Sequence, residues 1–511
     1  MTHPGSSAAA APRTPPDPQA ASASSVRVVI ASVAVLLLLA SLDQSIVSTA
    51  LPTIVADLGG LDHLSWVVTA YILASTIVAP LYGKLGDMYG RRVMVFLSVG
   101  LFLAGSALCG LATSMTWLIL ARGVQGLGGG GLFVLALSIV GDLIPPRERG
   151  RIQGMFAVVF GTSSVAGPLL GGWFVEQASW PWIFYINLPI GALALVGFAY
   201  GFAARSERVA RKIDYAGAVT LSLGLGALVL VTSLGGRSLP WDGPEALVLI
   251  ALSVAAFAAF VLIERRAAEP ILPLGLFRLN TFWVTSAVGF AAGAGLFGAV
   301  TFLPLFLQIA KGASPTASGM LMIPMMAGIL LASNLSGRFM RRTGRYRILL
   351  IHGTGSLTLG LALLTTITAE MPLWLFCLYL SFVGLGMGCI FPVTTTAVQN
   401  AVGREQIGVA TAAGLMFRQV GGAVGVALFG AMFGAAVTAR LGDVIRDAGE
   451  IGPQMLSGLD SLQRSEVVGA VVAGTHPIYV VASCIAAVGL GFSLLLKEVP
   501  LASSVPGKPT A

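Results

Sequence analysis

Three charged side chains stand inside long apolar stretches of this sequence, and they are its first candidates for chemistry. They are Asp43, Arg122 and Arg418. A charge at the centre of a membrane costs several kcal/mol, so such residues usually face an internal cavity and mark a transport pathway. Asp43 lies about seven residues, and Arg122 about six, from the ends of their stretches. At a rise of 1.5 Å per residue both lie about 10 Å below the same membrane surface, which permits them to pair.

Composition fixes the class of protein that holds these charges. Of the 511 residues, 56% are hydrophobic and 10% are charged, and the mean hydropathy is +0.88. In soluble proteins roughly a quarter of all residues are charged, so this sequence predicts an integral membrane protein. The four cysteines all fall in apolar stretches and have no metal-ligand or disulfide spacing, which favours a role in packing. We expect no metal site.

Fourteen apolar stretches are each long enough to cross a bilayer core of about 30 Å as a helix. None alternates apolar and polar residues as a β-barrel strand does, so the predicted fold is all-α. The predicted spans are 27–50, 64–82, 93–112, 116–140, 152–174, 183–203, 214–235, 244–263, 281–303, 317–336, 348–368, 372–396, 407–433 and 475–496.

The basic residues predict the orientation. Of the 30 lysines and arginines, two lie within spans and five fall on the side opposite the termini, namely Arg237, Lys311, Arg440, Arg446 and Arg464. The rest share the side of the termini, so the positive-inside rule places both termini in the cytoplasm. The net charge of +8 is thereby explained by topology and contact with anionic lipid, and no nucleic-acid partner is expected.

An internal repeat predicts the domain organisation. The segment from Gly83 to Arg92, between the second and third spans, recurs in degenerate form from Gly337 to Arg345, with Arg341 in the place of Asp87. Such duplication is typical of transporters built from two related halves. The predicted division is a disordered cytoplasmic tail (1–26), a six-helix bundle (27–203), two inserted helices with linkers (204–280), a second six-helix bundle (281–496) with an extracellular loop (434–474), and a cytoplasmic tail (497–511).

The repeated segment resembles the signature loop of the major facilitator superfamily, G-x-L-a-D-r-x-G-r-r. Gly83, Asp87, Gly90, Arg91 and Arg92 match it, and Met88 replaces a basic residue. The resemblance implies a gating role, in which Asp87 and Arg91 bridge the two halves when the inner face is closed. It also implies that the second half, with Arg341, does not form the same latch. A solvated turn is the alternative.

Two helices resemble the fourteen-helix drug:proton antiporter branch of that superfamily. The segment from Leu42 to Pro52 is similar to its first-helix signature, and the segment beginning at Arg122 and including Gln125 is similar to its fourth-helix motif R-x-x-q-G-x-g. The resemblance implies that Asp43 couples proton entry to export and that Arg122 assists proton transfer. A structural partnership between the two is the alternative. Gln125 and Arg418 are candidates for the substrate cavity; for Arg418 a role in helix packing is the alternative.

The fifth span is similar to the antiporter motif G-x8-G-x3-G-P-x2-G-G of the same superfamily. The matching residues are Gly154, Ser163 (in place of glycine), Gly167, Pro168, Gly171 and Gly172. The resemblance implies an exporter. A kinked helix that allows close packing, with no meaning for direction, is the alternative.

The sequence thus predicts a proton-coupled exporter of lipophilic, preferentially cationic compounds that works by alternating access. No G-x4-G-K-[ST] loop is present, so we expect no nucleotide or other cofactor beside the proton gradient. We expect a monomer in the cell membrane, with membrane lipid, protons and a small molecule as partners, and not an enzyme. An exporter of a lipid or metabolite and a non-transporting membrane sensor are the alternatives.

Overall fold

A computed structural model describes residues 23–59, 63–202, 214–235, 239–241, 243–441 and 461–502. Within these ranges fourteen helical segments are long and apolar enough to cross a membrane, and no strand is found. The prediction of an all-α protein with fourteen transmembrane helices is confirmed.

Seven helices form the first half of the chain. They are α1 (Ala23–Leu58), α2 (Leu64–Tyr89), α3 (Arg91–Gly110), α4 (Met115–Leu143), α5 (Pro146–Gln177) and the pair α6 (Trp182–Tyr185) and α7 (Asn187–Gly201), which together make the sixth span. Two inserted helices follow, α8 (Tyr215–Leu234) and α9 (Pro244–Glu264).

The second half contains the remaining helices. They are α10 (Asn280–Ala310), the short α11 (Pro315–Met320), α12 (Ile323–Thr343), α13 (Arg347–Leu364), α14 (Leu373–Ala401), α15 (Ile407–Leu441) and α16 (Ser461–Leu494). Because these apolar helices have no water to satisfy their backbone groups in a bilayer, each makes its hydrogen bonds internally.

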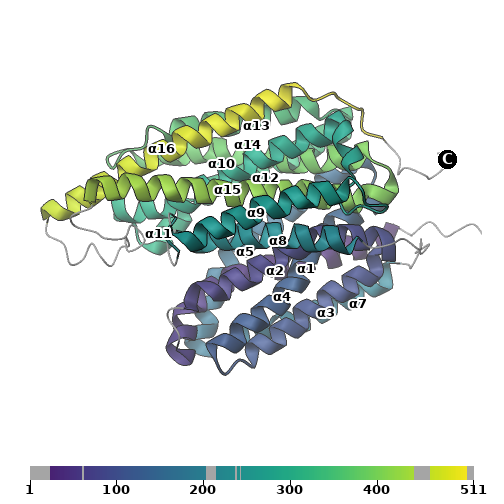
Figure 1. Cartoon of the computed structure of the whole chain (residues 1–511), viewed down its shortest axis with the longest axis horizontal. Helices are drawn as coiled ribbons and strands as arrows, with labels where there is room; N and C mark the ends of the chain where they lie inside the picture. The colour runs from purple at the N-terminus through teal and green to yellow at the C-terminus, as the bar shows by residue number, and fades with distance from the viewer. Residues whose placement is uncertain are drawn as a thin grey trace, which may run out of the picture.

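The two halves lie side by side, with the inserted helices next to their junction (Figure 1). Contacts between halves run mainly along α2 with α15 and along α5 with α12. Helices α8 and α9 pack on each other, and α8 also packs on α2 and α15. We call the end of the bundle that holds Ala23 and Ala502 the terminal face, and the end that holds Leu441 and Ser461 the distal face.

The signature segment is more helical than its sequence predicts. Residues 83–89 are the last turns of α2, and α3 begins at Arg91, so the expected loop is reduced to Gly90. Gly90 has φ 89°, and Gly344, which is its counterpart in the repeat, has φ 70°. Side chains rarely adopt this left-handed region, so a glycine at the same place in both halves allows the sharp reversal.

The predicted extracellular loop is also largely replaced by helix. Helix α15 continues to Leu441 and α16 starts at Ser461, so residues 434–441 and 461–474 are helical; residues 442–460 lie outside the described chain. The two extensions project beyond the neighbouring helices (Figure 1). Val437 and Leu441 of α15, and Val471 of α16, are buried in one apolar cluster. This shared seam explains why charged residues in the segment did not end the helices.

The first described residues of the predicted C-terminal tail are bound to the terminal face. In this strap, residues 495–502, the Lys497 backbone N–H donates to Asn280 Oδ1 at 2.6 Å. Glu498 Oε1 accepts the backbone N–H groups of Tyr346 at 2.8 Å and Arg347 at 3.2 Å. The buried Tyr346 hydroxyl accepts the Val499 N–H at 3.2 Å. Burial raises the pKa of this hydroxyl, which keeps it neutral.

Glu498 therefore caps the first turn of α13 from a distance in sequence. Replacing Glu498 with Ala is expected to lower the stability of this region by about 1 kcal/mol, as the loss of an N-terminal cap does. Thermal unfolding in mild detergent measures the change. Replacing the exposed Glu466 with Ala is the matched control. Equal midpoints for the two variants would contradict the capping role.

Candidate functional site

Asp43 of α1 and Arg122 of α4 form a buried ion pair in the first half. Arg122 Nη1 donates to Asp43 Oδ2 at 2.5 Å, and each residue is 1% exposed. The two residues, which the sequence predicts at equal depth in the membrane, are therefore in direct contact. Since a desolvated charge is costly alone, each of these groups depends on the other for its place in the bundle.

Two amides complete the surroundings of the Asp43 carboxylate. Gln125 Nε2 of α4 donates to Asp43 Oδ1 at 2.7 Å, and Asn187 Nδ2 of α7 donates to the same oxygen at 3.0 Å. Ser106 Oγ of α3 accepts from both amides, at 2.8 Å from Gln125 and 3.1 Å from Asn187. We call Asp43, Ser106, Arg122, Gln125 and Asn187 the Asp43 network.

The guanidinium of Arg122 is satisfied on its other sides. Its Nε donates to the Val67 carbonyl at 3.2 Å, and its Nη1 also donates to Gln125 Oε1 at 2.7 Å. The centre of the guanidinium lies 4.4 Å from the centroid of the Tyr71 ring. Such hydrogen bonds and ring contacts are what make a buried pair tolerable. A proton on Asp43 would cancel the attraction that holds this arrangement together.

Sequence reasoning found two members of the network and misplaced a third. Gln125, which we expected at the substrate cavity, is 0% exposed and bonded to Asp43. Ser106 and Asn187 were not singled out. The sequence gives little indication of their role, because each is a single uncharged polar residue in an apolar span. Whether such a residue reaches Asp43 depends on which helices pack together.

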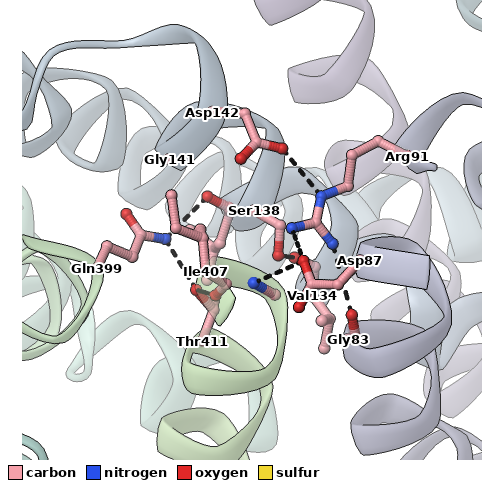
Figure 2. A network of polar contacts seen from close by, with 12 residues as sticks. Gly83, Asp87, Arg91, Val134, Ser138, Gly141, Asp142, Gln399, Ile407 and Thr411 are labelled. Atoms are coloured by element: carbon pink, nitrogen blue, oxygen red, sulfur yellow. Dashed lines mark hydrogen bonds and ion pairs between the residues drawn. The ribbon is translucent and has the colours of Figure 1, made fainter. Parts of the chain in front are cut away.

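The signature segment joins the halves at the terminal face, as its resemblance implies (Figure 2). The Asp87 carboxylate accepts the backbone N–H groups of Gly408 at 3.2 Å and Val409 at 2.8 Å, at the start of α15. Arg91 donates to Asp87 and, through Nε, to Asp142 Oδ2 at 3.0 Å. A carboxylate at a helix N-terminus is favoured by the unpaired N–H groups and by the helix dipole.

Two further side chains cross between the halves at the same level. Gln399 Nε2 of α14 donates to the Leu137 carbonyl of α4 and to Thr411 Oγ1, both at 3.0 Å (Figure 2). Gln153 Nε2 of α5 donates to Thr396 Oγ1 of α14 at 3.3 Å. We call the Asp87, Gln399 and Gln153 contacts the terminal gate, and in this structure they join the two halves.

The glycine and arginine residues of the signature differ in what they contact. A Cβ at Gly83 would lie 2.8 Å from the Gly408 carbonyl oxygen, so the glycine lets α15 approach. Arg92 does not take part in the gate. It donates to the Ala199 carbonyl at 3.4 Å and lies over the Phe96 ring, both within the first half.

The second half makes a different contact at the equivalent place. Arg341 is exposed, and α12 approaches α5 through paired glycines instead. A Cβ at Gly337 would lie 2.6 Å from the Gly150 carbonyl carbon. The strap adds to this side, because Arg147 Nε of α5 donates to the Leu501 carbonyl at 2.9 Å.

The antiporter motif packs α5 against the helix that carries Asp43. Ser45 Oγ of α1 donates to the Ser163 carbonyl at 3.0 Å, and a Cβ at Gly171 would lie 3.0 Å from the Ile46 carbonyl oxygen. Gly167 faces Ser45 even more closely. Helix α5 continues through Pro168 without interruption.

The outer members of this motif behave differently. A Cβ at Gly154 would lie 3.3 Å from Asn334 Oδ1 of α12, across the junction of the halves. Gly172 has no neighbour within 4 Å of such a Cβ, so close packing does not explain it. Helix α5 therefore contacts α1 near Asp43 on one side and α12 of the second half on the other.

Arg418 of α15 is separate from both the Asp43 network and the terminal gate. Its guanidinium centre lies 4.3 Å from the centroid of the Phe391 ring of α14. None of the acidic residues in the described chain lies within ion-pair distance of it.

Comparison with known sequences identifies the family of this chain. The sequence profile described as "Major Facilitator Superfamily" matches residues 33–426. The chain belongs to the major facilitator superfamily. Two similar relatives come from Bacillus subtilis (strain 168). "Multidrug transporter protein MdtP" is 39% identical over 422 residues, which are 83% of this chain and 76% of the relative. "Multidrug resistance protein 3" is 36% identical over 428 residues, which are 84% and 83% of the two chains.

Solved structures of this superfamily share the fold. The human organic anion transporter MFSD10 aligns with a TM-score of 0.62 at 17% identity, over 91% of this chain and 99% of that one. The proton:xylose symporter XylE aligns with a TM-score of 0.62 at 14% identity, over 92% and 95%. At these identities the likeness concerns the fold alone. The family and the fold are those of membrane transporters, and the two named relatives are a multidrug transporter and a multidrug resistance protein.

Proposed function

We propose that this major facilitator protein exports lipophilic compounds, including antibiotics, in exchange for protons that bind at Asp43. The observation that carries the proposal is the buried Asp43–Arg122 pair, completed by Gln125 and Asn187. An ionisable pair at this depth is costly and is found mainly where protons or substrates move. The exporter assignment is supported by the antiporter motif on α5 and by the efflux proteins among the relatives.

The packing suggests how protonation of Asp43 affects the junction of the halves. A proton on Asp43 removes the charge that holds Arg122, which leaves an unpaired buried cation and favours a rearrangement of α1. Helix α1 is bonded to α5 through Ser45 and Ser163, and α5 packs on α12. Because packed helices move as rigid bodies, a shift of α1 is expected to move one half against the other.

The positive-inside rule makes the terminal face cytoplasmic in this proposal, and the cell membrane its location. The closed terminal gate then corresponds to a conformation sealed toward the cytoplasm. The sequence predicts a preference for cationic compounds. In this conformation the carboxylate is 1% exposed and paired with Arg122, so it offers no free charge to a cargo.

Flux measurements with the Asp43→Asn variant test the coupling. Proteoliposomes with an imposed pH gradient would be loaded with a fluorescent lipophilic compound, and native protein compared with the variant. We expect gradient-driven flux to fall to the level of empty liposomes, because an amide neither takes up nor releases a net proton near neutral pH. Asp57→Asn is the matched control on α1, since Asp57 bonds to Trp180 away from the network, and it should retain most of the flux.

Other results would contradict the proposal in distinct ways. Flux that persists in Asp43→Asn would place the coupling residue elsewhere. Native protein that moves no lipophilic compound under any gradient would instead support a non-transporting role. Gradient-driven movement of a lipid or metabolite, but not of drugs, would support the endogenous-cargo alternative on the same fold.

A further inference from the structure

Among the described residues, Arg418 is an intramembrane cation with no acidic side chain within ion-pair distance. It lies eleven residues beyond the start of α15 at Ile407, or about 16 Å along the helix axis. By contrast, Arg122 is paired with Asp43, and Arg91 with Asp87 and Asp142. No acidic residue in the described part of the chain plays this role for Arg418.

The environment of Arg418 orients its charge without neutralising it. The guanidinium lies 4.3 Å from the Phe391 ring centroid, a separation typical of cation–π contacts. The side chain as a whole is half-buried. Ring stacking also restricts the long side chain, which lowers the entropy that a ligand would have to overcome.

Exposed polar side chains occur beside Arg418 and on α1. Gln419, next to Arg418, is exposed, as are Gln44 and Ser48 on the first-half helix that carries Asp43. Exposed polar side chains at membrane depth are tolerated where they line a water-filled cavity rather than lipid. Asp43 itself contributes no net charge, because it is paired. Arg418 is therefore the uncompensated charge that this region presents.

We propose that Arg418, held by Phe391, binds the anionic group of the cargo, so that this exporter prefers amphipathic carboxylates to cations. The inference rests on the proposed export function and specifies its substrate class. A guanidinium presents paired N–H donors that match the two oxygens of a carboxylate. An apolar cargo body suits the Phe391 ring, and a cation at the same place would meet like charge.

Binding of a matched set of probes tests this inference. The probes carry one dansyl fluorophore on one apolar chain that ends in a carboxylate, its methyl ester or a primary amine. Native protein in nanodiscs is expected to bind the carboxylate at least about tenfold more tightly than the ester, and the amine least. Arg418→Met should reduce carboxylate binding to the level of the ester. Arg418→Lys should retain part of the preference, because lysine keeps the positive charge but lacks the paired N–H donors of the guanidinium.

Control measurements separate a binding role from a structural one. Arg440→Met removes a charge from the same helix at its exposed distal end, and it should leave the preference unchanged. Arg418→Met should unfold at the same temperature as the native protein or a higher one, because an unpaired buried charge is lost. A lower unfolding temperature together with weaker binding of all three probes would identify Arg418 as a structural residue and overturn the inference.

The remaining outcomes distinguish this inference from the export function on which it rests. Equal binding of the carboxylate and the amine by native protein, or a preference that persists in Arg418→Met, would overturn the inference alone. Gradient-driven flux of the neutral ester tests export separately, and we expect it in both native protein and Arg418→Met. Absence of ester flux in both would count against export, while the binding preference would still be measured.

Discussion

Replacing Arg122 with Leu is expected to destabilise this protein by about 3–5 kcal/mol, because the change leaves the Asp43 carboxylate buried beside no cation. The carboxylate is 1% exposed, so water cannot take the place of the guanidinium. Gln125 and Asn187 would still donate to Asp43, but neutral amides do not balance its charge. Since folded domains are stable by only about 5–15 kcal/mol, the loss should be visible as poor yield and a lower unfolding temperature.

The double substitution is the decisive control for this prediction. Asp43→Asn combined with Arg122→Leu removes both charges, so it should be more stable than Arg122→Leu alone, even though more contacts are lost. Thermal unfolding of the native protein, both single variants and the double variant in one detergent forms a complete cycle. If the double variant were no more stable than Arg122→Leu, the pair would not be the reason for the instability.

The second large effect is expected at the terminal gate. Replacing Asp87 with Asn should weaken the closed conformation by at least tenfold and reduce transport to a similar extent. Asp87 accepts two backbone N–H groups of α15, and hydrogen bonds to a charged acceptor contribute about 1.5–3 kcal/mol each. An asparagine offers one uncharged oxygen in this place, so part of this stabilisation and the attraction to the helix N-terminus are lost.

Labelling of a buried cysteine measures the opening of the gate. Thr396 is 0% exposed and accepts the Gln153 hydrogen bond between the halves, so Thr396→Cys, in a background without the native cysteines, reports access from the terminal face. We expect its labelling by a water-soluble thiol reagent to become about tenfold faster when Asp87→Asn is added.

Asp142→Asn is the matched control for the gate. Asp142 bonds to Arg91, as Asp87 does, and Arg91 lies in the same half as Asp142. It should therefore change labelling much less than Asp87→Asn. Equal labelling rates for the two variants would show that access depends on the loss of an acidic partner of Arg91, and not on the release of α15 from Asp87. Unchanged rates for both would show that Asp87 does not hold the gate.

The gate and the Asp43 network are linked by the same few helices. Helix α4 contributes Arg122 and Gln125 to the network and, nearer the terminal face, the Leu137 carbonyl that binds Gln399. Helix α5 contacts α1 beside Asp43 and carries Gln153 of the gate. Because interfaces between packed helices switch between discrete arrangements, a change of charge at Asp43 has a short physical route to the gate.

The amino-acid sequence determined the features that depend on local composition. Each transmembrane helix needs about twenty apolar residues, so fourteen spans could be counted from hydropathy, and the structure has fourteen. The depths of Asp43 and Arg122 followed from residue counts along those spans. The repeat, with copies that begin at Gly83 and Gly337, was likewise visible, and Gly90 and Gly344 near the ends of the two copies have positive φ.

Helix ends were harder to predict, because they depend on neighbours as well as on local sequence. Residues 434–441 and 461–474 contain charged residues and look like a loop, but packing between α15 and α16 extends both helices. In the same way, the charged end of α2 remains helical to Tyr89 because Asp87 finds partners on α3 and α15.

Only the tertiary structure decided which polar groups meet. Ser106 and Asn187 join Asp43 because α3 and α7 pack on α1 and α4, and nothing local distinguishes them from other polar residues in apolar spans. Asp87 meets a backbone N–H that lies 321 residues further along the chain. Gln125 is drawn into the network, whereas Arg418 is left without an acid. Hydropathy is a property of each segment, but pairing of charges is a property of how segments pack, and in this protein the packing sets the function of each charge.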